Sequence, residues 1–214
     1  MWSWDITYLA TTVRGSFFYL YLILAIDSRK IVGGEVYPEA CAEHAAEVFQ
    51  RAHRREALGA TDRVLHADNG SPMKGATLRA TLQHLGVVPS FSRPSVSNDN
   101  PYSAAIFATG KGCPACPEQP FADLPEARTW VADFVTGYNE THRHSALKFV
   151  TPDPRHRSQD RHLLAQRDAL YQAARAENPE RWSGPTRNWD PPTRVLLNPG
   201  KPRPPQDPTQ EPAP

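Results

Sequence analysis

Two acidic residues, Asp5 and Asp68, lie where carboxylates can hold a cation. Asp5 lies within an alternating, aromatic-rich stretch at residues 2–10, and Asp68 follows a short apolar stretch in the sequence LHADNGS. Carboxylates at or near strand ends are typical of hard-cation sites, because oxygen ligands can converge there without burial of unpaired charge. Asp68 has a second interpretation, since Asp-Asn-Gly is also a good turn sequence.

The first half of the chain is predicted to form a mixed α/β sheet that positions these acids. Residue patterns predict strands at 2–10, 17–26, 30–37, 63–67 and 87–91, and helices at 39–58 and 74–85. The first three strands are joined by short turns and form an antiparallel meander, whose middle strand is buried on both faces. Gly59 and Gly86 are expected to end the two helices.

The second half is predicted to be helical and to end in a tail. Helices are expected from Pro101, at 124–138 and at 161–176. Residues 98–100 are expected to cap the first of these, because Asn and Asp side chains favour that position. Trp130, Phe134 and Tyr138 fall on one helical stripe, which indicates a core-facing surface. Residues 199–214 are Pro-rich, charged and free of aromatics, so we expect a disordered tail.

Composition narrows the class of protein. The chain has 214 residues, 39% of them hydrophobic, and a net charge of +1, which fits one domain with tails and leaves any polyanion site to local clusters of basic residues. Three cysteines favour a reducing compartment, so we expect a cytoplasmic protein. The most apolar run, residues 17–26, is too short to span a bilayer, so no membrane partner is expected.

The lone pair Cys113-Pro-Ala-Cys116 offers two thiols at zinc-ligand spacing. One such pair cannot complete a tetrahedral zinc site, and the later histidines lack a clear ligand spacing relative to it. We therefore expect two loop thiols.

Five sequence motifs occur in an order that resembles one family. They are WDITYL at 4–9, YLILAIDSRKIVG at 21–33, LHADNGS at 65–71, SRPSVSNDNPYSAAIF at 92–107 and YNETHRHSALKFVTP at 138–152. Together they are similar to the catalytic core of bacterial insertion-sequence DDE transposases, within the retroviral-integrase superfamily. The resemblance implies a ribonuclease-H-like fold at residues 1–155. Residue pattern and composition predict a helical and loop extension at 156–198 and the tail at 199–214.

The resemblance also implies a metal site with one ligand missing. Asp5 matches the first acid of the family and Asp68 the second, and both would be catalytic and would bind Mg²⁺ or Mn²⁺. The third acid, a Glu, is separated from the second by 35 residues, which leads to Ala104. Two-metal phosphodiester transfer needs near-ideal oxygen coordination, so metal binding is expected to be weakened.

No neighbouring acid is expected to replace the missing Glu. Helical spacing puts five residues near the face of position 104, namely Asn100, Pro101, Phe107, Ala108 and Lys111. None of them is acidic. Asp99 is expected to serve in capping, and Glu118 lies beyond the helix.

Three further departures from the family pattern point the same way. The family usually has an Asp in place of Ala25, a large apolar residue in place of Gly34, and Leu in place of Gly110. A glycine inside a short helix costs about 1 kcal/mol relative to alanine, and a lost Leu contact would cost more. We therefore expect a weakened helix around position 104, and the hypothesis is sequence drift in an idle copy.

Basic residues near the expected site are candidates for DNA binding. They are Lys111, Arg93, Arg143 and His144. Phosphate contacts need such donors but carry no sequence information, and each residue could equally belong to a solvated face. Relatives of this type normally carry a helix-turn-helix reader before the core, whereas here Met1 is followed at once by the first strand, so sequence-specific end recognition in cis is not expected.

Three functions remain open at this stage. The first is a transposase integrase core that cuts and joins DNA, whose chemistry we expect to be impaired by Ala104. The second is a non-catalytic remnant that retains weak binding to DNA or to subunits. The third is a ribonuclease-H-like nuclease with another substrate. Expected partners are DNA and, through the shared fold, a second copy or a full-length transposase subunit.

Overall fold

A five-stranded mixed sheet forms the centre of the molecule. The computed structural model describes residues 1–56, 63–94, 99–113, 116–193 and 195–197. The strands are β1 (Trp2–Ala10), β2 (Phe17–Ala25), β3 (Ile31–Tyr37), β4 (Arg63–Ala67) and β5 (Val87–Phe91), in the order β3-β2-β1-β4-β5. The first three are antiparallel, whereas β4 runs parallel to both β1 and β5. This is the predicted ribonuclease-H-like arrangement of a meander plus two further strands, and it confirms the fold class.

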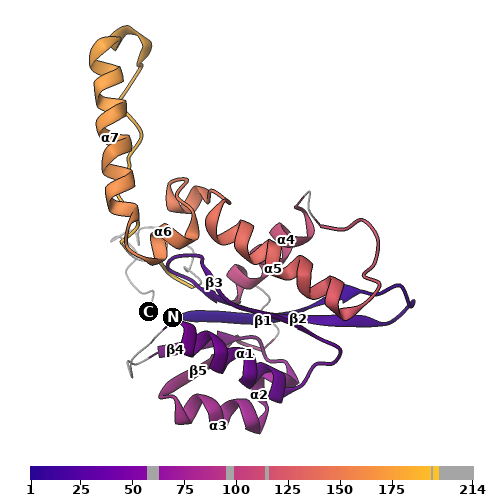
Figure 1. The fold of residues 1–214 in the computed structure, drawn as a ribbon. Coiled ribbons are helices and arrows are strands. Elements are labelled where there is room, and N and C mark those ends of the chain that lie inside the picture. The colour runs from indigo at the N-terminus through magenta and orange to yellow at the C-terminus, as the bar shows by residue number, and fades with distance from the viewer. Residues whose placement is uncertain (57–62, 95–98, 114–115, 194, 198–214) are drawn as a thin grey trace, which may run out of the picture.

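Helices cover both faces of this sheet (Figure 1). One face carries α1 (Ala42–Arg55), α2 (Ser71–Lys74) and α3 (Ala76–His84), and the other carries α4 (Pro101–Lys111) and α5 (Leu124–Glu140). Each face has its own core, because side chains alternate along the strands. Trp2, Trp4 and Tyr21 pack under α1, whereas Leu20, Leu22 and Leu24 pack under α4 and α5. The middle strand β2 is therefore buried on both faces, as predicted.

The predicted helix at 74–85 is instead two helices separated at Gly75. Gly75 has extended backbone angles, φ −60° and ψ 144°, and serves as the N-cap of α3. A Cβ at this position would clash with the Cβ of Ala42, at the start of α1. The break therefore lets α1 approach this segment closely, and Gly86, with φ +68°, ends the second helix as expected.

The aromatic stripe predicted on α5 packs into the second core. Ring centroids lie 5.5 Å apart for Phe121 and Trp130, 5.7 Å for Trp130 and Phe134, and 5.9 Å for Phe134 and Tyr138. Burial raises the pKa of Tyr138 to about 12, so its hydroxyl remains neutral. The core-facing interpretation of this stripe is confirmed.

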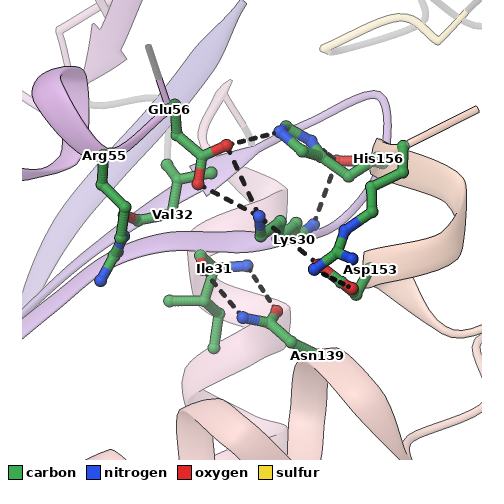
Figure 2. Close-up of polar contacts among 10 residues, drawn as sticks. Lys30, Ile31, Val32, Arg55, Glu56, Asn139, Asp153 and His156 are labelled. Carbon is green, nitrogen blue, oxygen red and sulfur yellow. Dashed lines mark hydrogen bonds and ion pairs between the residues drawn. The ribbon is translucent and has the colours of Figure 1, made fainter.

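An asparagine attaches the end of α5 to the start of β3. The side chain of Asn139 is buried and faces the backbone of Ile31, as Figure 2 shows. Its Oδ1 accepts the Ile31 N–H and its Nδ2 donates to the Ile31 carbonyl, both at 2.9 Å. The amide thus satisfies both backbone groups of a residue that is only 1% exposed.

A polar network joins α6 (Pro152–His156) to the sheet. Lys30 Nζ lies 3.1 Å from Glu56 Oε1 and 3.5 Å from Asp153 Oδ1, and His156 Nε2 lies 2.8 Å from Glu56 Oε2 (Figure 2). Burial opposes ionisation of Glu56, but Lys30 and His156 outweigh it and hold its pKa below the ordinary value. The carboxylate therefore links three elements that are far apart in the sequence.

The chain beyond α6 extends away from the core. Helix α7 (Asp160–Glu177) projects as an arm, with the following segment running back alongside it (Figure 1). Two short 3₁₀ helices, η2 (Ser145–Leu147) and η3 (Pro179–Arg181), precede and follow it. A small third core of Leu147, Val150, Leu164 and Trp189 holds its base. The predicted tail at 199–214, and Gly59, lie outside the described residues, within which no helix is long and apolar enough to cross a membrane.

Candidate active site

Asp5 lies on β1, and Asp68 directly follows the neighbouring parallel strand β4. Ser3 of β1 pairs with His66 of β4, so a step of two residues along each strand leads to Asp5 and Asp68. Adjacent strands are about 4.8 Å apart, and residues two apart point to the same face. Because Trp4 and Leu65 face the α1 side, Asp5 and Asp68 face the α4 side. The fold therefore brings the two predicted carboxylates together.

The electrostatics of Asp5 reflect this arrangement. Burial raises the pKa of Asp5 to about 6, the Ile6 N–H that donates to its Oδ1 at 2.8 Å lowers it, and the charge of Asp68 raises it further. A half-buried carboxylate that is destabilised by a second carboxylate is a chemical setting that favours a bound cation. The two residues present fit part of a divalent-metal site.

Asp68 is held by a chain of side-chain hydrogen bonds. The Ser92 hydroxyl donates to Asp68 Oδ1 at 2.6 Å and lies 3.3 Å from His66 Nε2. The other ring nitrogen of His66 lies 3.0 Å from the hydroxyl of Ser90, and burial lowers the pKa of this histidine. A neutral His66 therefore positions Ser92, which in turn orients the Asp68 carboxylate. Neither His66 nor Ser92 was predicted as a site residue, although both lie within the quoted motifs at 65–71 and 92–107.

Helix α4 is fixed along β1 by contacts at both of its ends. At the N-terminal end Ser3 Oγ donates to Asn100 Oδ1 and lies 2.8 Å from Ser103 Oγ, while Asn100 Nδ2 donates to the Trp4 carbonyl. At the other end, Lys111 Nζ donates to Thr7 Oγ1 at 2.9 Å. The helix therefore runs alongside the part of β1 that contains Asp5.

Ala104 lies on the helical stripe between these two contacts. Positions 100, 104, 107 and 111 follow one face of a helix, and the first and last of them contact β1 on either side of Asp5. Ala104 is exposed, and α4 contains no acidic residue. Residue 104 therefore lies on the stripe of α4 whose ends contact β1, and it offers only a methyl group.

The predicted capping of α4 is wrong for the described residues. Asn100 is the N-cap, but its side chain makes no capping bond because it is engaged with β1. Asp99 accepts hydrogen bonds from Arg93 Nε and Nη2, both at 2.9 Å, and from the Arg93 backbone N–H. Asp99 thus orders the loop before α4. Asn98 lies outside the described residues.

The two glycines that depart from the family pattern are closely packed. A Cβ on Gly110 would lie 3.1 Å from the ring of Phe134, and one on Gly34 would lie 3.2 Å from Leu22 Cδ2 and from Val135 Cγ2. Neighbouring side chains therefore fill the space that larger residues would need. The expected loss of packing at Gly110 is not seen, and these positions do not support the drift hypothesis.

The four predicted DNA contacts come from the two ends of α4 and from the segment that follows α5. Lys111 is exposed at the C-terminal end, and Arg93, with 70% of its side chain exposed, lies before the N-terminal end. Arg143 is exposed, whereas His144 is half-buried, its Nδ1 lies buried without a partner, and burial together with Arg29 lowers its pKa. Only Lys111 contacts the strand that carries Asp5.

Arg29 is a further basic residue near this helix that the sequence analysis missed. Its guanidinium lies 3.9 Å from the ring centroid of Tyr102, on α4. Arg29 lies in the turn between β2 and β3 and has a φ of +63°. The only local signal was its place after Asp27-Ser28 in a short turn, so the contact depends on tertiary packing.

One prediction follows from the raised pKa of Asp5. The folded state binds the Asp5 proton more tightly than the unfolded chain, from an ordinary value of 3.8 to about 6, so this group lowers stability as pH rises through that window. The shift corresponds to at most about 3 kcal/mol. Asp5→Asn is expected to raise the free energy of unfolding by about 2 kcal/mol at neutral pH and to leave it unchanged near pH 3.

Urea denaturation at the two pH values measures this effect. Asp133→Asn is the matched control, since Asp133 is exposed on α5. It is expected to change stability by less than about 0.5 kcal/mol at either pH. Equal stability of Asp5→Asn and the unaltered chain at neutral pH would show that Asp5 is not electrostatically strained.

Comparisons with known proteins define the class of this chain. Two family models, both described as integrase core domain, match residues 1–97 and 85–152. Together they span the sheet, both flanking layers and the segment up to the start of α6. The chain therefore belongs to the integrase core family, of the type found in insertion-sequence DDE transposases.

Among characterised proteins, the chain is similar to the transposase for insertion sequence element IS904 of Lactococcus lactis subsp. lactis. The identity is 28% over 159 residues, which are 71% of this chain and 59% of the relative. The chain thus spans about three-fifths of the length of the relative that it matches.

Two solved structures show a distant likeness. The catalytic core domain of BIV integrase is 16% identical with a TM-score of 0.47, covering 71% of this chain and 89% of its own. A chain of the simian T-cell lymphotropic virus intasome in complex with PP2A regulatory subunit B56 gamma is 12% identical with a TM-score of 0.45, covering 65% of this chain and 48% of its own.

Proposed function

We propose that this chain is a transposition core that binds DNA but cuts and joins it poorly, because its metal site lacks the third carboxylate. Family membership supports the reaction class, which is phosphodiester cleavage and strand joining with Mg²⁺ or Mn²⁺. The proposed impairment rests on one observation. Ala104, which has no carboxylate, lies on the α4 stripe whose ends contact β1 on either side of Asp5.

Each residue near the site would have a distinct role in metal or DNA binding. Asp5 and Asp68 would hold a divalent ion, which in such sites activates the attacking oxygen and stabilises the leaving one. Ser92 and His66 orient the Asp68 carboxylate. Lys111 would contact a phosphate of the bound strand, because its exposed ammonium lies on the same face as Asp5.

A labelled duplex, incubated with Mg²⁺ or Mn²⁺, tests this proposal. The unaltered chain is expected to bind the duplex and to nick or join it only slightly above background. Any residual activity should disappear in Asp68→Asn, because that change removes one of the two carboxylates. Absence of DNA binding would contradict the proposal, and so would vigorous cutting that survives Asp68→Asn.

Lys111 supplies a separate prediction about DNA binding. Lys111→Ala is expected to weaken duplex binding several-fold without sequence preference and to reduce the slope of log affinity against log salt by about 1. Fluorescence anisotropy over a range of salt concentrations measures both quantities. Arg79→Ala is the control, since Arg79 is exposed on α3, on the opposite face of the sheet. Equal losses in the two variants would mean that Lys111 makes no dedicated contact.

The alternative, a non-catalytic remnant, predicts a different result when the missing carboxylate is restored. A remnant would bind DNA or subunits, but no single substitution would recover cleavage. The close packing at Gly34 and Gly110 favours an intact scaffold over a decayed one. The nuclease alternative gains no support from the described residues.

A further inference from the structure

A second group of ligand-type side chains lies far from the two aspartates, at the start of α1. Within the described residues, one set of at least three His, Cys, Asp or Glu side chains has its ligand atoms mutually close. It comprises Glu39, Cys41 and His44, whose ligand atoms all lie within 4.8 Å of one another. Glu39 and Cys41 lie in the connection from β3 to α1, and His44 lies in the first turn of α1.

We propose that Glu39, Cys41 and His44 form a binding site for Zn²⁺ or a similar borderline transition-metal ion. A thiolate, an imidazole and a carboxylate are the donor types that zinc binds, whereas Mg²⁺ and Ca²⁺ take oxygen ligands. The site therefore differs in metal class from the oxygen-only pair at Asp5 and Asp68. The inference does not rest on the proposed function.

The spacing of the ligand atoms fits a shared ion. Zinc bonds of about 2.0–2.3 Å in tetrahedral geometry separate two ligand atoms by roughly 3.3–3.8 Å. His44 Nε2 already lies 3.8 Å from Glu39 Oε1. The Glu39 side chain is 75% exposed, so its carboxylate can move toward an ion that Cys41 and His44 hold. Three protein ligands leave a fourth position for water.

The surrounding side chains hold this arrangement before any ion binds. The ring of His44 stacks on Tyr37 with centroids 3.8 Å apart and an interplanar angle of 11°. The hydroxyl of Tyr21 accepts the Cys41 N–H at 2.9 Å and lies 3.2 Å from the Cys41 carbonyl. Such outer contacts orient metal ligands and typically change affinity by about 10–100-fold.

A metal would compete with one carboxylate for the thiol of Cys41. Cys41 is the N-cap of α1, but its side chain makes no capping bond. It interacts with the carboxylate of Glu43, whose pKa is lowered first by the Thr77 hydroxyl and also by Cys41. Binding of a metal would replace the thiol proton, which leaves to solvent. No oxidant or other reactant is needed.

A metal bound by Glu39, Cys41 and His44 would link the β3–α1 connection to the first turn of α1. Since binding to the folded state alone adds to its stability, Zn²⁺ is expected to raise the melting temperature of the chain. The effect requires both Cys41 and His44.

Cobalt(II) is the probe for the site, because a thiolate ligand gives it a near-ultraviolet charge-transfer band. The reference protein is the full chain carrying Cys113→Ser and Cys116→Ser, in a non-thiol reductant, so that Cys41 is the remaining cysteine. We expect a thiolate charge-transfer band that saturates at one Co²⁺ per chain, and loss of this band when Zn²⁺ displaces the Co²⁺.

Variants separate this site from adventitious binding. Cys41→Ser is expected to lose the band, and His44→Ala to weaken Zn²⁺ binding at least about 100-fold. His84→Ala, which changes an exposed histidine on α3, should keep both the band and the zinc-dependent rise in melting temperature. Far-ultraviolet circular dichroism checks that each variant is folded. A band that persists in Cys41→Ser, or a reference protein that binds no Co²⁺, would overturn the proposal.

Discussion

Ala104→Glu is expected to raise metal-dependent nicking and strand joining by about 100-fold or more over the unaltered chain. The expected size follows from the usual effect of one preorganised charge-stabilising group, about 10²–10³-fold. The physical reason is positional. The α4 stripe that contains residue 104 contacts β1 at Trp4 and at Thr7, so a carboxylate on it would project toward Asp5.

The neighbouring position supplies the matched control for this experiment. Ala105→Glu adds the same charge to an exposed position of the same helix, but about 100° around its axis and off the stripe. It should leave activity at the level of the unaltered chain. Ala104→Gln, which has the shape of glutamate without its charge, should also recover little.

A double variant tests whether activity recovered by Ala104→Glu comes from the proposed metal site. Activity of Ala104→Glu should disappear when Asp68→Asn is added, because the site then lacks a carboxylate again. Equal gains in Ala104→Glu and Ala105→Glu would point to a general charge effect and contradict the geometry. If no variant cuts DNA although all bind it, the chain is a non-catalytic remnant.

The candidate aspartates could be predicted from the sequence because their placement depends on local pattern and strand order. Alternating residues 2–10 and the short run 63–67 indicated two strands, and the family resemblance supplied their pairing. Once β1 and β4 are parallel neighbours, the register of Ser3 with His66 fixes Asp5 opposite Asp68. No long-range side-chain contact had to be known.

Contacts made by side chains across the sheet could not be predicted in this way. Gly110 looked like a lost leucine contact, yet Phe134 of α5 fills that space. Gly75 looked like an ordinary residue within a helical pattern, but its close approach to Ala42 breaks the helix in two. In both cases the deciding neighbour is at least 24 residues away in sequence, where no local periodicity reports it.

The Glu39, Cys41 and His44 group shows a signal that was present but not used. Cys41 and His44 are three residues apart at the start of a predicted helix, which puts them on one face. The pair Cys113 and Cys116, in contrast, has no third ligand nearby among the described residues. Mixed Cys and His spacings at helix starts are therefore worth the same scrutiny as CxxC.

Asn139→Ala is expected to lower the free energy of unfolding by about 3–4 kcal/mol. The side chain satisfies both the N–H and the carbonyl of Ile31, which is 1% exposed, so its removal leaves two buried backbone groups unpaired. Each such group costs about 1–3 kcal/mol. Loss of the packing between α5 and the start of β3 adds to this cost.

Denaturant unfolding followed by circular dichroism measures the loss, and Glu140→Ala is the control because it truncates the next, exposed residue of α5. That variant should change stability by less than about 0.5 kcal/mol. Asn139→Asp keeps an acceptor for the Ile31 N–H but sets a carboxylate against the Ile31 carbonyl, so at neutral pH it should be about as unstable as Asn139→Ala. A loss below about 1 kcal/mol in Asn139→Ala would mean that water replaces the amide, and that α5 is attached to β3 mainly by apolar packing.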